Sequence, residues 1–192
     1  SYFENKEQFP KKLEAVRSYH HQIIADLFSE EKVLVTEKID SLFDGALGFL
    51  FDNAVDNYSL VYDQVVSIGE LVSSTIISYY MRHEDIENTW LDARKCVKTD
   101  TYYRDANLDW EKTKTEILTM VKGNSTLISQ GFIGSAPNGM TTTLGREGSD
   151  YSAAIFAYAI VADSVTIWKD VPGVLNGDPR EFEDTVLLNQ IS

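Results

Sequence analysis

TTTLGREGSDYSAA, residues 141–154, contains the turn from which the fold of this chain can be worked out. Gly145–Gly148 predicts a tight turn that leads into a helix over Asp150–Val161, and Ser164–Trp168 predicts a further strand. A strand, a turn, a helix and a second strand at this spacing form a crossover unit. Crossover units predict an α/β fold with a largely parallel sheet and helices on both of its faces.

The whole chain has 11 glycines, and eight of them fall at or after Gly123. The first half, which is poor in glycine, is therefore predicted to be helical. Apolar residues recur at helical spacing over residues 8–28 and again from Val35 to Ala54, which predicts a helical hairpin. A third, short helix is expected over Tyr58–Val66. The next stretch, Ser67–Glu70, is expected to interrupt it and to begin another helix near Gly69.

Shorter elements are expected between these helices and the glycine-rich turn. Asn88–Asp92 predicts a short strand, and Asp109 is a plausible N-cap for a helix that ends at Val121. Leu127–Ile133 predicts a short buried strand. Asn138-Gly139 is a strong turn signal, and with the apolar residues on either side of it predicts a hairpin-like excursion.

Composition and charge limit the possible partners. The chain has 192 residues, is 43% apolar and carries a net charge of −13, which argues against a nucleic-acid partner but not against a nucleotide bound at a local anion site. Cys96 is the single cysteine, so we expect a buried structural thiol and no internal disulfide. No uninterrupted apolar run reaches the ~18 residues of a membrane span and no secretory leader is recognisable, so a cytoplasmic location without membrane contact is expected.

The turn at Gly145–Gly148 is the first candidate binding site. Arg146 offers a planar fork suited to a carboxylate, and Ser149 and Asp150 lie where a helix dipole favours an anion. These residues could hold a small carboxylate. The alternative from spacing alone is a plain turn in which Ser149 or Asp150 caps the helix and Arg146 faces solvent.

Two further segments could line the same or a neighbouring site. Glu70 could pair with a substrate ammonium, or could be a first-turn glutamate favoured by a helix dipole. Lys169 and Arg180 flank a loop directly after a predicted strand, where α/β sheets bind ligands, and could face nucleotide phosphates; a plain surface loop is the alternative. The histidines (His20, His21 and His83) show no metal-ligand spacing, so no protein metal site is expected.

Four segments, in the right order, resemble the amino-acid kinase fold family and, within it, the aspartokinases. The first two are VSIGELVS (Val66–Ser73), similar to V-S-x-G-E-x-x-S, and LISQGFIGS (Leu127–Ser135), similar to T-Q-G-F-I-G. The third, residues 141–154, is similar to T-T-T-L-G-R-G-G-S-D-x-x-A. The last, IWKDVPGVLNGDPR (Ile167–Arg180), is similar to I-x-T-D-V-x-G-V/I-Y-x-x-D-P-R.

The resemblance implies a three-layer sandwich with a helical insertion over residues 1–66 and a substrate- and ATP-binding part over residues 67–192. The implied reaction transfers phosphate from ATP, with Mg²⁺, to the side-chain carboxylate of L-aspartate. By the same resemblance, the substrate is bound by Glu70, Phe132, Arg146, Ser149 and Asp150, of which Asp150 is also assigned to catalysis. The ATP site is assigned to Lys169, Asp170, Leu175 and Arg180.

Departures from the family pattern keep two alternatives open. Glu147 replaces a glycine, Lys169 replaces a threonine and Leu175 replaces a tyrosine. The family's opening K-F-G-G-T-S-V strand, a later lysine and the regulatory ACT domains have no counterpart in these 192 residues. The chain is therefore expected to be part of a homo-oligomeric enzyme and to show little or no turnover alone. The alternatives are a kinase of this fold that acts on another acceptor and a non-catalytic binding module.

Overall fold

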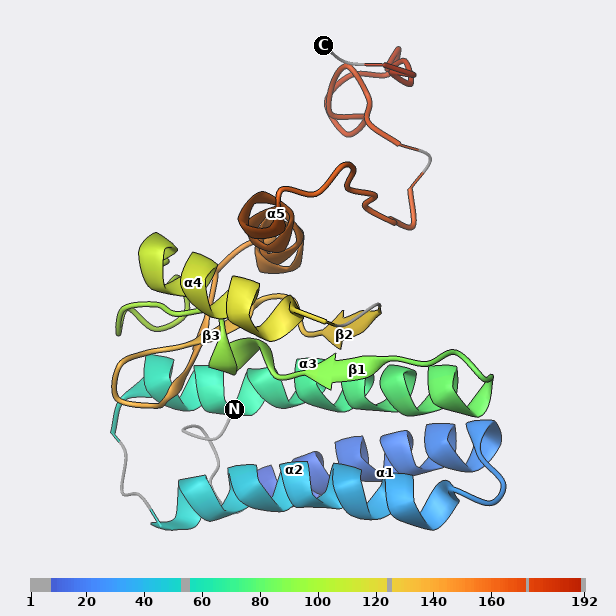
Figure 1. The fold of residues 1–192 in the computed structure, drawn as a ribbon, viewed down its shortest axis with the longest axis vertical. Helices are drawn as coiled ribbons and strands as arrows, with labels where there is room; N and C mark the ends of the chain where they lie inside the picture. Colours follow the sequence, from blue (N-terminus) through green and yellow to red (C-terminus); the bar gives the residue numbers. More distant parts are fainter. Residues whose placement is uncertain (1–7, 53–55, 124–125, 172, 191–192) are drawn as a thin grey trace.

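Helices α1 (Phe9–Leu27) and α2 (Lys32–Asp52) form a hairpin that lies along α3 (Tyr58–His83) in the computed structural model (Figure 1). The structure describes residues 8–52, 56–123, 126–171 and 173–190, so Ala54, the expected end of the second helix, lies outside it. The predicted hairpin is confirmed. Buried apolar side chains hold the three helices together: Leu13, Ile24, Phe28, Val35, Ile39, Phe43, Ile68, Val72 and Ile76.

Helix α3 is a single element of 26 residues, and the prediction of a short helix interrupted at Ser67–Glu70 is wrong. Gly69 lies in the middle of α3 and does not begin a helix. One glycine costs a helix about 1 kcal/mol relative to alanine, and the packing of α3 on both sides outweighs that cost. Its first turn is capped by Asn57, whose side chain accepts a hydrogen bond from the Leu60 amide at 3.1 Å.

The composition of α3 follows from its place between two layers. Ile68, Val72 and Ile76 face the hairpin, and Leu71 belongs to the core on the strand side. Because it is covered from two sides, α3 is long and apolar enough to pass as a membrane span, with a mean hydropathy of 1.3 in a window that is 50% buried. A core helix of a globular domain passes the same test, so this is weak evidence for a membrane.

Two small sheets lie above α3. Strands β1 (Thr89–Leu91) and β2 (Leu127–Ser129) pair in parallel, with Trp90 opposite Ile128. Strands β3 (Ile133–Ser135) and β4 (Thr141–Thr143) form an antiparallel hairpin, with Gly134 opposite Thr142. The expected strand at β1 and the expected hairpin are confirmed. The single strand expected over Leu127–Ile133 is instead divided between β2 and β3 by a turn that contains Gly131.

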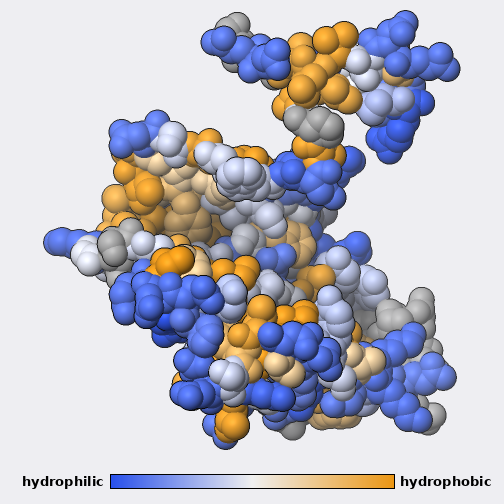
Figure 2. All heavy atoms as spheres, turned by 90° about the vertical axis from the view of Figure 1, so that its right-hand side faces the viewer, coloured by the Kyte–Doolittle hydropathy of each residue, from blue (hydrophilic) through white to orange (hydrophobic). Residues whose placement is uncertain are grey.

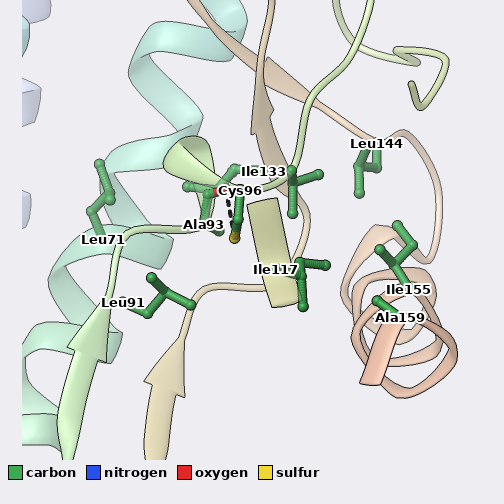
Figure 3. Packing of buried hydrophobic residues seen from close by; sticks show 10 residues of the cluster. Leu71, Leu91, Ala93, Cys96, Ile117, Ile133, Leu144, Ile155 and Ala159 are labelled. Carbon is green, nitrogen blue, oxygen red and sulfur yellow. Dashed lines mark hydrogen bonds between the residues drawn. The ribbon is translucent and has the colours of Figure 1, made fainter. Parts of the chain in front are cut away.

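Helices α4 (Trp110–Val121) and α5 (Gly148–Ile160) lie on the far side of the strands from α3 (Figure 1). Asp109 caps α4 as expected, because its carboxylate accepts a hydrogen bond from the Lys112 amide at 3.1 Å. Figure 3 shows the core between these layers, with side chains from α3, the strands, α4 and α5 pointing toward one another. It is formed by Leu71, Leu91, Ala93, Cys96, Val97, Ile117, Ile133, Leu144, Ile155 and Ala159.

Cys96 is fully buried in this core, as expected for a structural thiol. Its thiol lies 3.5 Å from the Ala93 carbonyl oxygen, to which it donates (Figure 3). Burial raises the pKa of the Cys96 thiol to about 11. The thiol therefore stays protonated and unreactive near neutral pH.

The chain after α5 forms a C-terminal arm, described over residues 161–171 and 173–190. The arm leaves the layered body of helices and strands and projects away from it (Figure 1). The prediction of a strand over Ser164–Trp168 is wrong, because this segment has no regular secondary structure and every residue in it is exposed. A strand needs neighbours to satisfy its backbone N–H and C=O groups, and within the described ranges nothing pairs with this segment. At its tip Leu175 forms a β-bridge with Leu187, and Figure 2 shows apolar side chains gathered on this part of the arm. Val174, Phe182 and Val186 are exposed apolar residues of the same segment.

Candidate functional site

The glycine-rich turn brings two distant sequence motifs into contact. Gly145 has φ +74°, a left-handed conformation that glycine adopts without strain, and it packs against the Asp105 carboxylate. A Cβ at Gly148 would lie 2.6 Å from the ring of Phe132, so only glycine fits there. The Phe132 amide donates to the Ser152 hydroxyl of α5 at 2.8 Å. The segments after β2 and β4 therefore meet at the first turn of α5.

The start of α5 differs from the alternative in which Ser149 or Asp150 caps the helix. Its N-cap is Glu147, with φ +58° and no side-chain hydrogen bond to the helix, so neither Ser149 nor Asp150 is the cap. Asp150 lies in the first turn, where the helix dipole favours a carboxylate. The side chain of Arg146 is 93% exposed, and its Nε lies 4.0 Å from the Glu147 carboxylate. Arg146 thus presents its guanidinium to solvent or to a ligand.

An open cleft of about 970 Å³ lies beside this turn. It brings together the predicted substrate residues Phe132 and Arg146. The other predicted substrate residues (Glu70, Ser149 and Asp150) are not among the residues that line it. The lining consists of Asn57, Ser59, Tyr62, Thr101, Tyr102, Tyr103, Arg104, Asp105, Phe132, Gly145 and Arg146.

Asp63 of α3 holds the backbone of Arg104, one of the residues that line the cleft. It is fully buried and accepts hydrogen bonds from the Arg104 amide at 2.9 Å, the Thr143 amide at 3.0 Å and the Thr143 hydroxyl at 2.8 Å. Burial raises the pKa of the Asp63 carboxyl, and these hydrogen bonds oppose the rise. Asp63 was not among the residues predicted from the sequence, where its only signal is a charge within an otherwise apolar helical stretch.

Gln64 reinforces the same junction. Its amide nitrogen donates to the Thr141 carbonyl at 2.8 Å, and its amide oxygen accepts from the Thr141 amide at 3.1 Å. The side chain thus satisfies both backbone groups of the first residue of β4, as a neighbouring strand would. Together Asp63 and Gln64 fix β4, and with it the turn that follows, relative to α3.

Glu70 lies on the same face of α3, seven residues after Asp63 and four before Ser74. Ser74 contacts the strand layer, since its hydroxyl accepts from Trp90 Nε1 at 3.1 Å and from Gln130 Nε2 at 2.7 Å. The contacts of Asp63 and Ser74 therefore direct Glu70 toward the strands. Burial raises the pKa of its half-buried carboxyl, and nothing in the described part of the chain forms a hydrogen bond or an ion pair with that carboxylate.

Two predicted site residues from different motifs are joined by an ion pair. Lys169 Nζ lies 2.6 Å from the Asp150 carboxylate, with 50% and 37% of the two side chains exposed. This hydrogen bond raises the pKa of the Lys169 ammonium. The pair connects the first turn of α5 to the arm. A residue expected at the substrate site, Asp150, therefore contacts a residue expected at the ATP site, Lys169.

The other residues expected at the ATP site lie along the arm and are not gathered around one hollow. Asp170 is exposed, Leu175 belongs to the small bridge at the tip, and Arg180 forms an ion pair with Asp178 at 2.8 Å. A hollow of about 390 Å³ at the tip is lined in part by Glu181, Glu183 and Asp184, an acidic lining that disfavours phosphate, and none of the four expected ATP residues lines it.

The described residues contain no group of three histidine, cysteine, aspartate or glutamate side chains that could hold a metal ion. Mg²⁺ in nucleotide-using enzymes is commonly held by substrate phosphates together with one or two carboxylates. The expectation of Mg²⁺ therefore depends on a bound nucleotide and not on a metal cage built by this part of the chain.

Comparison with known proteins gives a consistent family. The amino acid kinase family matches residues 8–192. Lysine-sensitive aspartokinase 3 of Escherichia coli (strain K12) is 34% identical over 186 residues, which are 95% of this chain and 41% of that protein. The bifunctional aspartokinase/homoserine dehydrogenase 2 of the same organism is 32% identical over 184 residues, 91% of this chain and 22% of that protein.

A solved structure agrees with the sequence relatives. The crystal structure of E. coli aspartokinase III in complex with aspartate and ADP superposes with a TM-score of 0.81 at 33% identity, covering 93% of this chain and 40% of that one. The chain spans about two fifths of the length of the E. coli aspartokinase 3 sequence and of the aspartokinase III structure that it matches. The family match over nearly the whole chain, the layered fold and the glycine-rich turn at α5 place this chain in the amino acid kinase family.

Proposed function

We propose that this chain is the acceptor-binding region, and part of the nucleotide-binding region, of an aspartokinase. The enzyme would transfer the γ-phosphoryl group of ATP to the side-chain carboxylate of L-aspartate, giving 4-phospho-L-aspartate and ADP. The similarity to two E. coli aspartokinases and to a structure that holds aspartate and ADP supports this proposal. Residues 1–66 would serve as the helical insertion and residues 67–192 as the binding part, with α3 connecting them.

Glu70 is the observation that carries the proposal. A half-buried carboxylate that has lost part of its hydration, and that has no partner in the described residues, is suited to receive a cation. The ammonium group of an amino acid is such a cation. A ligand that also carries carboxylates fits the exposed guanidinium of Arg146, which can form a bidentate pair.

The remaining roles follow the sequence expectations. Phe132 would form the wall of the acceptor site, and Ser149 and Asp150 would contact the substrate from the first turn of α5. Asp150 would also act in catalysis. Its ion pair with Lys169 would align the acceptor with the nucleotide, which would be bound by Lys169, Asp170, Leu175 and Arg180 together with Mg²⁺. Phosphoryl transfer depends mainly on in-line positioning and on neutralisation of charge, so such pairs are the contribution required of the protein.

Three wider expectations belong to the same proposal. The complete enzyme would be a homo-oligomer and would be cytoplasmic where its host has no plastids, since the matching plant relatives are described as chloroplastic. The 192 residues by themselves would show little or no turnover. No nucleic-acid or membrane partner is proposed.

Calorimetric titration of the full-length protein tests the proposal. We expect L-aspartate to bind and N-acetyl-L-aspartate, which lacks the ammonium group, not to bind. Glu70→Gln should weaken aspartate binding about ten- to a hundred-fold, as expected when one partner of a charged hydrogen bond is removed. The matched control is Glu116→Gln, a partly exposed glutamate of α4, which should leave the affinity unchanged.

The stability of the same variants provides an independent check of Glu70. Because burial raises its pKa, ionised Glu70 costs the folded state free energy at neutral pH, and this cost disappears below the ordinary pKa of 4.5. Glu70→Gln should therefore raise the free energy of unfolding at pH 7, by at most about 1 kcal/mol for a half-exposed group. The gain should shrink as the pH falls toward 4.5. Preference for an N-blocked acceptor, or a destabilised Glu70→Gln, would contradict the assignment.

A further inference from the structure

Arg104 has a backbone conformation that its side chain does not favour. Its φ is +74°, in the left-handed region, where a residue other than glycine costs on the order of 1 kcal/mol. The carboxylate of Asp63 holds it there by accepting a hydrogen bond from the Arg104 amide at 2.9 Å. Strain of this kind is often found at binding sites, where the surrounding structure fixes a side chain in position.

Aromatic rings from the start of α3 position the guanidinium of Arg104. The guanidinium carbon lies 4.8 Å from the centre of the Tyr62 ring and 5.6 Å from that of Tyr58. Stacking uses the face of the guanidinium and leaves its in-plane N–H groups free to donate. Over the parts of the chain that the structure describes, no side-chain hydrogen bond or ion pair occupies these donors.

Arg104 and Arg146 line the same cleft. Two guanidiniums in one cleft are notable in a chain of net charge −13, and Asp105 is the one carboxylate among the described residues that line it. The Asp105 carboxylate packs against the backbone of Gly145. The cleft therefore offers two separate forks of N–H donors, a pattern that suits a small ligand with two carboxylates.

We propose that Arg104 is a specificity-determining residue that binds the second carboxylate of the acceptor. This inference rests on the proposed function. Arg146 would take the carboxylate next to the ammonium group, and Arg104 the side-chain carboxylate that receives the phosphoryl group. The enzyme would then distinguish an acidic acceptor from its neutral amide through Arg104.

Affinities of the full-length protein for L-aspartate and L-asparagine, from calorimetry and ligand-observed NMR, test this inference. Arg104→Gly removes the guanidinium and places glycine at φ +74°, so the urea midpoint of unfolding should stay the same or rise. Its affinity for aspartate should fall about ten- to a hundred-fold while that for asparagine stays unchanged. Arg104→Lys keeps the charge without the planar fork, so its affinity for aspartate should lie between those of the wild type and of Arg104→Gly.

Arg82→Gln is the matched control, because Arg82 also stacks on a tyrosine of α3, Tyr79 at 4.5 Å, but does not line the cleft. It should bind aspartate as the wild type does. Three results for Arg104→Gly would overturn the role of Arg104 without affecting the proposed function. They are an equal loss of affinity for aspartate and asparagine, an unchanged affinity for aspartate, and a lower urea midpoint of unfolding. A wild-type protein that binds no aspartate would overturn the proposed function, and this inference with it.

Discussion

Glu147 is a residue in a conformation better suited to glycine. It has φ +58° at the N-cap of α5, and its side chain makes no capping hydrogen bond. Glu147→Gly should therefore stabilise the chain by about 0.5–1 kcal/mol, because relief of the left-handed strain exceeds the added flexibility of the unfolded chain. Urea unfolding followed by circular dichroism measures the change.

A second variant separates backbone strain from charge. Glu147→Ala keeps the strained backbone and removes the carboxylate that lies 4.0 Å from Arg146. It should not reproduce the gain, since an exposed ion pair contributes little to stability. If alanine stabilised the chain as much as glycine, the strain explanation would be wrong.

At the residue scale, the sequence predicts which motifs meet but not how their side chains are held. The resemblance placed Phe132 and Arg146 in one site, and both line the cleft. The three hydrogen bonds of Asp63 and the left-handed backbone of Arg104 depend on contacts across 41 and 80 positions of the chain. Local patterns do not show which distant groups a residue contacts, and the one local signal here is the charge of Asp63 within an otherwise apolar helical stretch.

Helix α3 shows why local signals also fail at the scale of an element. Ser67–Glu70 looks like an interruption because it contains glycine, a poor helix former. The structure has both Ser67 and Ile68 buried, and the apolar residues of this stretch belong to two different clusters, Ile68 to the one on the hairpin side and Leu71 to the one on the strand side. Tertiary packing thus overrides a local preference of about 1 kcal/mol. Elements with clear caps and regular spacing, such as α4 and its N-cap Asp109, were predicted correctly.

Gly69→Ala tests the continuity of α3. Gly69 is exposed, its φ is not positive, and a Cβ there would meet no atom within 4 Å. Alanine should therefore stabilise the chain by about 0.8–1 kcal/mol, the difference in helix propensity. Thermal and urea unfolding give the value. Gly139→Ala is the contrasting control, because Gly139 has φ +79° and alanine there should destabilise. A neutral or destabilising Gly69→Ala would indicate a helix broken at this point.

At the scale of the whole molecule, the two apolar clusters end with α5, and none of the described residues of the arm belongs to them. The last residue of either cluster is Ala159, and residues 161–171 are exposed throughout. Ser164–Trp168 has the composition of a buried strand, so the sequence predicted one. A strand forms only where a neighbour can pair with it, and the sequence pattern cannot tell whether that neighbour is present.

Limited proteolysis of the 192-residue chain tests this division between the body and the arm. Local opening is easiest where few buried contacts must break, and the residues Trp168 and Phe182 of the arm are 91% and 61% exposed. Chymotrypsin should cut first at these two residues, and mass spectrometry should show a persistent product that ends at Trp168. Trp90, whose indole donates to Ser74 at 3.1 Å, should stay uncut, and Trp168→Ala should remove the first cut. Early cleavage within α1–α5 would mean that the two clusters do not hold the body together, because a body stabilised by them should lose the arm without unfolding.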